Sequence, residues 1–270
     1  MPHPLCLAHL SLIELSPPDM VTAAGTAGFE LVSLRLAPAS SGEVQHPMIG
    51  DTPMMRETQA RLQALGVAVH DVELVRLSRN TDIPACEPLM EAAARLNARQ
   101  VLVAGDDADE SLMAEKLAAL ACLGARYGLR MGLEFMPWRG IRNLASAARV
   151  VRQAGVGGIV VDAIHLDRSG GSVTDLGSLP VAQWAFFQIC DAPVRRPDTE
   201  AELLFQARQA RLAPGDGGLD LTNMLRALPP DIVISIEVPL HAHPDLLPPV
   251  PRARRLREAT LSLMASAHVG

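Results

Sequence analysis

Residues 100–134 read QVLVAGDDADESLMAEKLAALACLGARYGLRMGLE, and this stretch decides the fold. It opens with an apolar run at 100–104 and continues as an amphipathic stretch at 111–127. The chain then turns at Gly128 into a second apolar run at 130–134. Glycine tolerates the left-handed conformation in which helices commonly end. Short, nearly continuous apolar runs are typical of parallel strands that are covered on both sides. We therefore predict a strand–helix–strand unit.

The same alternation recurs along the whole chain. Apolar runs of strand length lie at residues 5–11, 30–36, 68–75, 100–104, 130–134, 158–162, 184–190 and 232–237. Amphipathic stretches that we predict as helices lie at 54–65, 88–96, 111–127, 144–154, 219–228 and 252–267. With no break in composition, this order predicts a single-domain α/β protein, a (β/α)8 TIM barrel over residues 1–270. The alternative is a doubly wound open sheet, which a GxGxxG motif after the first strand would favour, and the sequence has none.

Composition narrows the classes of partner. The chain carries a net charge of −6 and has no basic run interleaved with aromatic residues, so we predict no nucleic-acid partner. No apolar run approaches the roughly 20 residues of a membrane span, and the N-terminus has no basic leader. We expect a cytoplasmic protein that does not bind membranes. Barrels of this kind often pair, so a homodimer is a further expectation.

Oxygen-bearing side chains stand at or near the ends of four consecutive predicted strands. These residues are Glu134, Asp162, Gln188 and Glu237. The C-terminal ends of barrel strands converge on one mouth. Three carboxylates gathered there would repel one another unless a cation or shared protons offset their charge. A hard divalent ion would do so, and oxygen ligands favour Mg²⁺ or Mn²⁺, with Co²⁺ or Zn²⁺ as the alternatives.

The chain resembles the xylose isomerase-like barrels, a broad group of sugar phosphate isomerases and epimerases. The segments that carry this resemblance are 132–137 (GLEFMP), 161–166 (VDAIHL), 188–191 (QICD), Arg211 with 214–217 (PGDG), and 235–239 (SIEVP). The resemblance implies that Glu134, Asp162, Gln188 and Glu237 coordinate one divalent metal. Many members have a histidine at the position of Gln188. The glutamine form is similar to the hydroxypyruvate isomerase and 3-dehydroshikimate dehydratase branches.

Several residues are candidates for contact with the substrate. His165 follows Asp162 at a spacing that the resembling family uses for this purpose, and a histidine can exchange protons near neutral pH. The other candidates are His9, Arg35, Glu73, Arg139, Arg168 and Arg211. Each could instead be a structural ion pair or a hydrogen-bonded loop residue. The glycine-rich turn at 214–218 is either a flexible turn or an anion site made of free backbone amides.

The leading hypothesis for function is a metal-dependent isomerase or epimerase of a small hydroxy-carbonyl substrate. Glu134 and Glu237 would move a proton on opposite faces of an enediolate, with His165 assisting. The first alternative is a metal-dependent dehydratase of the 3-dehydroshikimate dehydratase type, with His165 as acid or base. The second is a non-catalytic sugar-binding barrel. A phosphodiesterase of the endonuclease IV type is disfavoured by the net charge and by the scarcity of histidine at strand ends.

Overall fold

The computed structural model describes residues 3–39, 42–240, 242 and 246–268. Its eight strands close into one barrel in which every neighbouring pair is parallel and β1 pairs with β8. The strands are β1 (Leu5–Leu7), β2 (Leu31–Arg35), β3 (Ala68–Leu77), β4 (Gln100–Gly105), β5 (Arg130–Glu134), β6 (Gly158–Asp162), β7 (Trp184–Ile189) and β8 (Ile234–Ile236). The predicted (β/α)8 barrel is confirmed.

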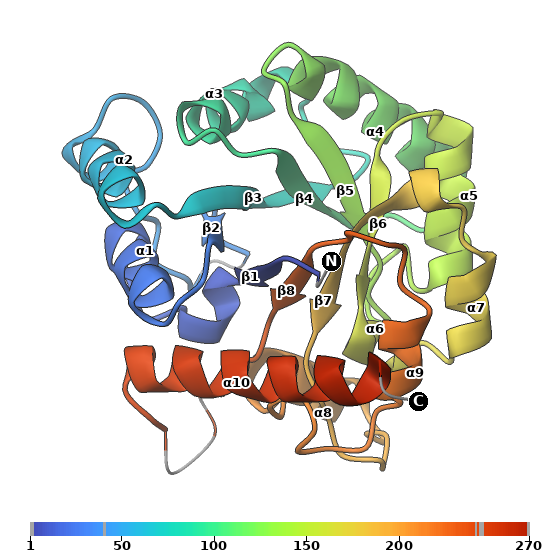
Figure 1. Ribbon diagram of the computed structural model, residues 1–270. Coiled ribbons are helices and arrows are strands. Elements are labelled where there is room, and N and C mark those ends of the chain that lie inside the picture. Colours follow the sequence, from blue (N-terminus) through green and yellow to red (C-terminus); the bar gives the residue numbers. More distant parts are fainter. Residues whose placement is uncertain (1–2, 40–41, 241, 243–245, 269–270) are drawn as a thin grey trace.

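Helices surround the strands on the outside of the barrel (Figure 1). They are α1 (Pro17–Thr26), α2 (Pro53–Leu65), α3 (Glu87–Arg95), α4 (Glu110–Ala125), α5 (Leu144–Ala154), α6 (Ala163–Arg168), α7 (Val173–Ser178), α8 (Glu200–Gln209), α9 (Leu221–Arg226) and α10 (Pro249–His268). Short 3-10 turns lie at η1 (His9–Leu12), η2 (Pro84–Cys86) and η3 (Val181–Gln183). The glycines at 66 and 155 end α2 and α5 with φ of 65° and 69°, the left-handed conformation that is common at helix ends.

The predicted first strand, at 5–11, is too long. The chain leaves β1 after Leu7 and turns into η1, because Ser11 binds the end of β8 through its side chain. The Ser11 hydroxyl donates to the Ile236 carbonyl at 2.9 Å and accepts from the Val238 amide at 2.8 Å. This bridge brings the backbone after β8, which carries Glu237, against the start of the chain.

Two apolar layers hold the strands in place. The larger one packs the helices against the outside of the sheet, and a smaller cluster around Phe186, Leu74 and Leu102 fills part of the barrel interior. Gly132 leaves room for this inner cluster, since a Cβ there would lie 2.9 Å from Val160 Cγ2. Across the described residues, we find no helix with the length and apolar character that a membrane span requires.

Candidate functional site

The four oxygen-bearing residues at the strand ends are all buried beneath the mouth of the barrel. Glu134 ends β5, Asp162 ends β6, Gln188 lies in β7 at the level of Asp162, and Glu237 follows β8. Each of these residues is at most 4% exposed. A cavity of about 310 Å³ opens above them, and Glu134, Glu237 and His165 form part of its wall.

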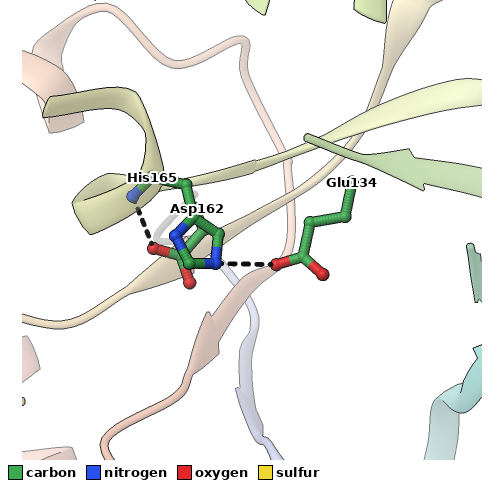
Figure 2. Close-up of side chains that lie close together, drawn as sticks. All are labelled: Glu134, Asp162 and His165. Atoms are coloured by element: carbon green, nitrogen blue, oxygen red, sulfur yellow. Dashed lines mark hydrogen bonds and ion pairs between the residues drawn. The ribbon is translucent and has the colours of Figure 1, made fainter. Parts of the chain in front are cut away.

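Asp162 joins the strand end to the next helix. Its Oδ1 accepts from the backbone amides of Ile164 at 2.9 Å and His165 at 3.3 Å, so it caps the N-terminus of α6. This cap turns the His165 ring toward β5, where Nε2 lies 3.5 Å from Glu134 Oε1 (Figure 2). Ligand atoms of Glu134, Asp162 and His165 all lie within 4.8 Å of one another. This group shares Glu134 and Asp162 with the predicted metal ligands and adds His165.

Arg211 forms ion pairs with two acidic residues of the site, Asp162 and Glu237. Its side chain is only 2% exposed, and its Nη1 lies 2.6 Å from Asp162 Oδ2 and 3.1 Å from Glu237 Oε2. The same nitrogen donates to the Glu237 carbonyl, and Nε donates to the carbonyl of Ala207 in α8. Arg211 therefore offsets part of the negative charge of the site and ties α8 to the barrel.

Gln188 has one satisfied and one unsatisfied polar atom. Its Nε2 donates to Glu237 Oε1 at 2.9 Å. Its Oε1 is buried and has no hydrogen-bond partner among the described residues. A buried amide oxygen beside carboxylates, with no donor to satisfy it, suits a hard divalent cation. The donor set at the strand ends therefore fits the metal that the sequence predicts.

Burial moves the pKa values of this group apart. It raises the pKa of Glu134 well above its ordinary value and that of Glu237 to about 8; nearby carboxylates add to both shifts, and Arg211 opposes them. Burial would also raise the pKa of Asp162, but the charges of Arg211 and His165 outweigh it and the net pKa is lowered. Burial lowers the pKa of His165 to about 4, so its imidazole is neutral at neutral pH.

Four of the predicted substrate contacts line the cavity, namely Arg35, Glu73, Arg139 and Arg211. Arg35 donates to Glu73 Oε2 through Nε at 2.9 Å and Nη2 at 2.6 Å, and its Nη1 pairs with Glu43 at 3.2 Å. Arg139 pairs with Asp106 at 2.9 Å. These two cations therefore already have carboxylate partners within the protein.

The two other predicted substrate contacts, His9 and Arg168, do not line this cavity. Nδ1 of His9 accepts from the Arg35 amide at 2.9 Å, and its Nε2 lies 3.0 Å from the Leu15 carbonyl. Arg168 donates to the Pro193 carbonyl at 2.7 Å and to Gln206 Oε1 at 2.9 Å. Both side chains hold loops in place.

The glycine-rich turn at 214–218 does not offer free amides to an external anion. The carboxylate of Asp191 already accepts from the amides of Gly215, Gly217 and Leu219, each at 3.0 Å. The alternative of an anion site is thus wrong, because the anion that the turn binds belongs to the chain itself. This arrangement fixes the turn that follows Arg211.

The cavity residues that are absent from the predicted set include Met136, Trp138 and Arg208. Trp138 packs its edge against His165, with ring centroids 4.9 Å apart and an interplanar angle of 85°. Arg208 lies on α8, a helix that the apolar pattern does not reveal. The signal that could have found α8 is its capping box, in which Thr199 accepts from the amide of Glu202 and the Glu202 side chain accepts in return.

The Ser33 hydroxyl lies between two buried carboxyl groups, and this arrangement predicts that Asp71 is protonated. Ser33 Oγ lies 2.8 Å from both Asp71 Oδ2 and Glu73 Oε1. Because a hydroxyl has one hydrogen, one carboxyl must donate to it. Burial, followed by the charge of Glu73, raises the pKa of Asp71 well above its usual value, whereas Arg35 and Ser33 outweigh burial and hold that of Glu73 low. Asp71 is therefore the donor.

Asp71→Asn should change the free energy of unfolding by less than about 1 kcal/mol, since its amide can still donate to Ser33. Asp71→Ala should cost about 2 kcal/mol or more, because it leaves buried polar groups unpaired and opens a void. Urea unfolding of the two variants measures the difference. Equal losses in both would show that Asp71 is not a neutral donor.

Comparison with known proteins places this site in a family. A family model described as the xylose isomerase-like TIM barrel matches residues 21–263. The chain belongs to this family. This membership confirms the resemblance carried by the strand-end motifs.

Two curated relatives of this xylose isomerase-like barrel are named 3-dehydroshikimate dehydratase. The protein from Pseudomonas aeruginosa is 31% identical over 158 residues, which cover 56% of this chain and 24% of the relative. The one from Pseudomonas putida is 25% identical over 223 residues, which cover 77% of this chain and 33% of the relative. The chain thus spans about a quarter to a third of their lengths.

Among solved structures, a crystal structure of the IolI protein with a bound zinc atom has a TM-score of 0.81 and 16% identity. The match covers 98% of this chain and 99% of IolI. At this identity the likeness supports the fold alone.

Proposed function

We propose that this xylose isomerase-like barrel is a metal-dependent dehydratase that removes water from a small hydroxy-carbonyl acid of the 3-dehydroshikimate type. The observation that carries the proposal is the position of His165, whose Nε2 lies 3.5 Å from Glu134 Oε1 in the wall of the cavity. The names of the two curated relatives support the same reaction class. Because the chain covers only part of those relatives, the activity remains our proposal.

Glu134, Asp162, Gln188 and Glu237 would hold one divalent ion, with the unpartnered Gln188 Oε1 completing an oxygen-rich donor set. When bound, the ion supplies a positive charge that polarises a carbonyl and acidifies the neighbouring C–H bond. The zinc atom of the structurally similar IolI protein supports a divalent metal. We retain Mg²⁺ or Mn²⁺ as the preferred ion because the donors are mostly oxygen atoms.

His165 is the residue that we assign to proton transfer. A neutral imidazole can take the proton from the carbon next to the carbonyl, and the C–H electron pair then forms the new double bond. The bond from the adjacent carbon to its hydroxyl breaks, and the proton leaves His165 with that hydroxyl as water. With a divalent ion bound, Glu134 would be held as a carboxylate, and at 3.5 Å from Nε2 it would stabilise the imidazolium between these steps. If the hydrogen and the hydroxyl leave from the same face of the substrate, His165 alone can carry out both proton transfers.

Trp138 and Arg211 position this machinery. The edge of Trp138 packs on the His165 ring and limits its rotation. The guanidinium of Arg211 holds the carboxyl groups of Asp162 and Glu237 in place through ion pairs. The cavity volume of about 310 Å³ favours a small substrate.

The test is a turnover assay of the purified chain, first stripped of metal and then supplied with Mg²⁺, Mn²⁺, Co²⁺ or Zn²⁺ in D₂O. The substrates are 3-dehydroshikimate, hydroxypyruvate and a panel of keto-sugars, with products followed by NMR and mass spectrometry. We expect metal-dependent loss of water from 3-dehydroshikimate to give an aromatic acid. His165→Asn should lower this rate by about 10²- to 10⁴-fold. His46→Asn, outside the cavity wall, is the matched control. Wild-type inertness toward 3-dehydroshikimate with every metal would contradict the proposal.

An isomerase or epimerase is the second candidate, favoured by a different observation. Glu134 on β5 and Glu237 after β8 are both buried carboxyl groups in the wall of one cavity, and the pKa of each is raised. Such a pair could remove a proton on one face of a substrate and return it on the other. In the same assay, deuterium uptake with formation of an isomer from hydroxypyruvate or a keto-sugar would favour this candidate.

A further inference from the structure

Four arginines line the cavity, and three of them are paired with carboxylates of the protein. Arg35 pairs with Glu73, Arg139 with Asp106, and Arg211 with Asp162. The fourth, Arg208, is exposed and forms no ion pair or hydrogen bond through its side chain with any residue in the described ranges. It is therefore the cavity arginine whose charge is available to a ligand.

Hydrogen bonds to the neighbours of Arg208 hold this end of α8 in place beside the cavity. Nε of Arg168 donates to Gln206 Oε1 at 2.9 Å, and Nε of Arg211 donates to the Ala207 carbonyl at 2.7 Å. On the other side of Arg208, the amide of Ala242 donates to the Gln209 carbonyl at 3.0 Å. Contacts at 206, 207 and 209 thus fix the end of α8, while the guanidinium at 208 makes no hydrogen bond or ion pair with the part of the chain that the structure describes.

The charge of Arg208 acts on the reacting end of the cavity. After burial, its positive charge is among the causes that lower the pKa of both His165 and Arg139. Arg208 lines the same cavity as both of these side chains. The acidic residues of the wall include Glu43 and Glu73, which already pair with Arg35 and offer no site to an anion. A bound anion needs an unpaired cation on this wall, and Arg208 supplies one.

We propose that Arg208 binds the carboxylate of the substrate, so that the cavity selects small hydroxy-carbonyl acids over neutral sugars. This inference rests on the proposed function and names the residue that sets its substrate class. A guanidinium presents two parallel N–H groups that match the two oxygens of a carboxylate. Bound in this way, the acid is anchored at α8 with its carbonyl side directed to the strand ends.

The test measures binding rather than turnover. Shikimate carries the carboxylate and ring hydroxyls but lacks a ketone, and shikimamide is its neutral counterpart. Isothermal titration of the Mn²⁺-loaded and metal-free chain with both probes gives the dissociation constants. We expect the wild type to prefer shikimate. Arg208→Gln should raise the dissociation constant for shikimate by about 10- to 100-fold, with that for shikimamide changed by less than about 2-fold. Arg208→Lys should restore part of the preference.

Arg152→Gln on α5 removes the same charge from an exposed site outside the cavity wall and is the matched control. A wild type without preference for shikimate, or an Arg208→Gln variant that binds it normally or loses both probes equally, would overturn the inference. The proposed function is judged separately. If the wild type dehydrates 3-dehydroshikimate and Arg208→Gln keeps its KM, the function stands and this inference falls. If shikimate selectivity depends on Arg208 but no dehydration occurs, this inference stands and the proposed function falls.

Discussion

Glu237→Gln is expected to lower turnover by about 10³-fold or more while the barrel stays folded. The substitution keeps the shape of the side chain but removes a carboxylate from the predicted metal ligands, and the new amide can accept from only one of Gln188 and Arg211. Steady-state rates with saturating Mn²⁺ measure the loss, and circular dichroism reports the fold. Glu115→Gln on the exposed face of α4 is the control. Near-normal turnover would remove Glu237 from the mechanism.

The same variant should change how stability depends on pH. Burial raises the pKa of Glu237 to about 8 in the folded protein, above that of an unfolded glutamate. Such a group stabilises the fold fully below the unfolded pKa, and this contribution is lost as pH rises from about 4.5 to about 8. The metal-free wild type should therefore lose stability over this interval more steeply than Glu237→Gln. Identical slopes in urea unfolding would contradict the assigned shift.

Arg211→Met is expected to destabilise the metal-free protein by about 3–5 kcal/mol. Removing one partner of a buried ion pair leaves an uncompensated charge in a medium of low polarity. Here the charge left behind is shared by Asp162 and Glu237, both within 3.1 Å of the guanidinium. Methionine keeps much of the aliphatic volume, so the loss would reflect charge rather than a cavity. Chemical unfolding gives the change.

Divalent metal separates this explanation from a packing effect. A cation bound by Asp162 and Glu237 would replace the missing positive charge, so Mn²⁺ should stabilise Arg211→Met by more than it stabilises the wild type. Arg252→Met, which removes another buried arginine that does not line the cavity, is the control and should gain no such additional benefit. Equal stabilisation of both variants by Mn²⁺ would show that Arg211 does not balance the metal-site carboxylates.

Much of the fold could be predicted because each strand is a short apolar run and each run lies between amphipathic stretches. The candidate ligands were visible for a related reason, since Glu134 and Asp162 are the last residues of their strands. A polar residue that interrupts an apolar run at its end is a local signal. A single sequence can carry such a signal without an alignment.

The pairing of side chains was not visible, because it depends on distant parts of the chain. Arg211 lies 49 residues from Asp162, and no local pattern connects them. The hydrogen bond of His9 was hidden for the same reason, since the Arg35 amide that donates to its ring is 26 residues away. Arg208 was missed because α8 buries only Ala207 among its residues, so the helix shows almost no apolar periodicity.

The account depends most on the claim that one divalent ion is held by oxygen atoms at the ends of adjacent strands. A crystal structure of the protein grown with Mn²⁺, with the ion located by anomalous scattering, tests it directly. We predict one ion coordinated by Glu134, Asp162, Gln188 and Glu237 at the mouth of the barrel. An ion bound elsewhere, or these four side chains without an ion at a saturating concentration of Mn²⁺, would contradict the account.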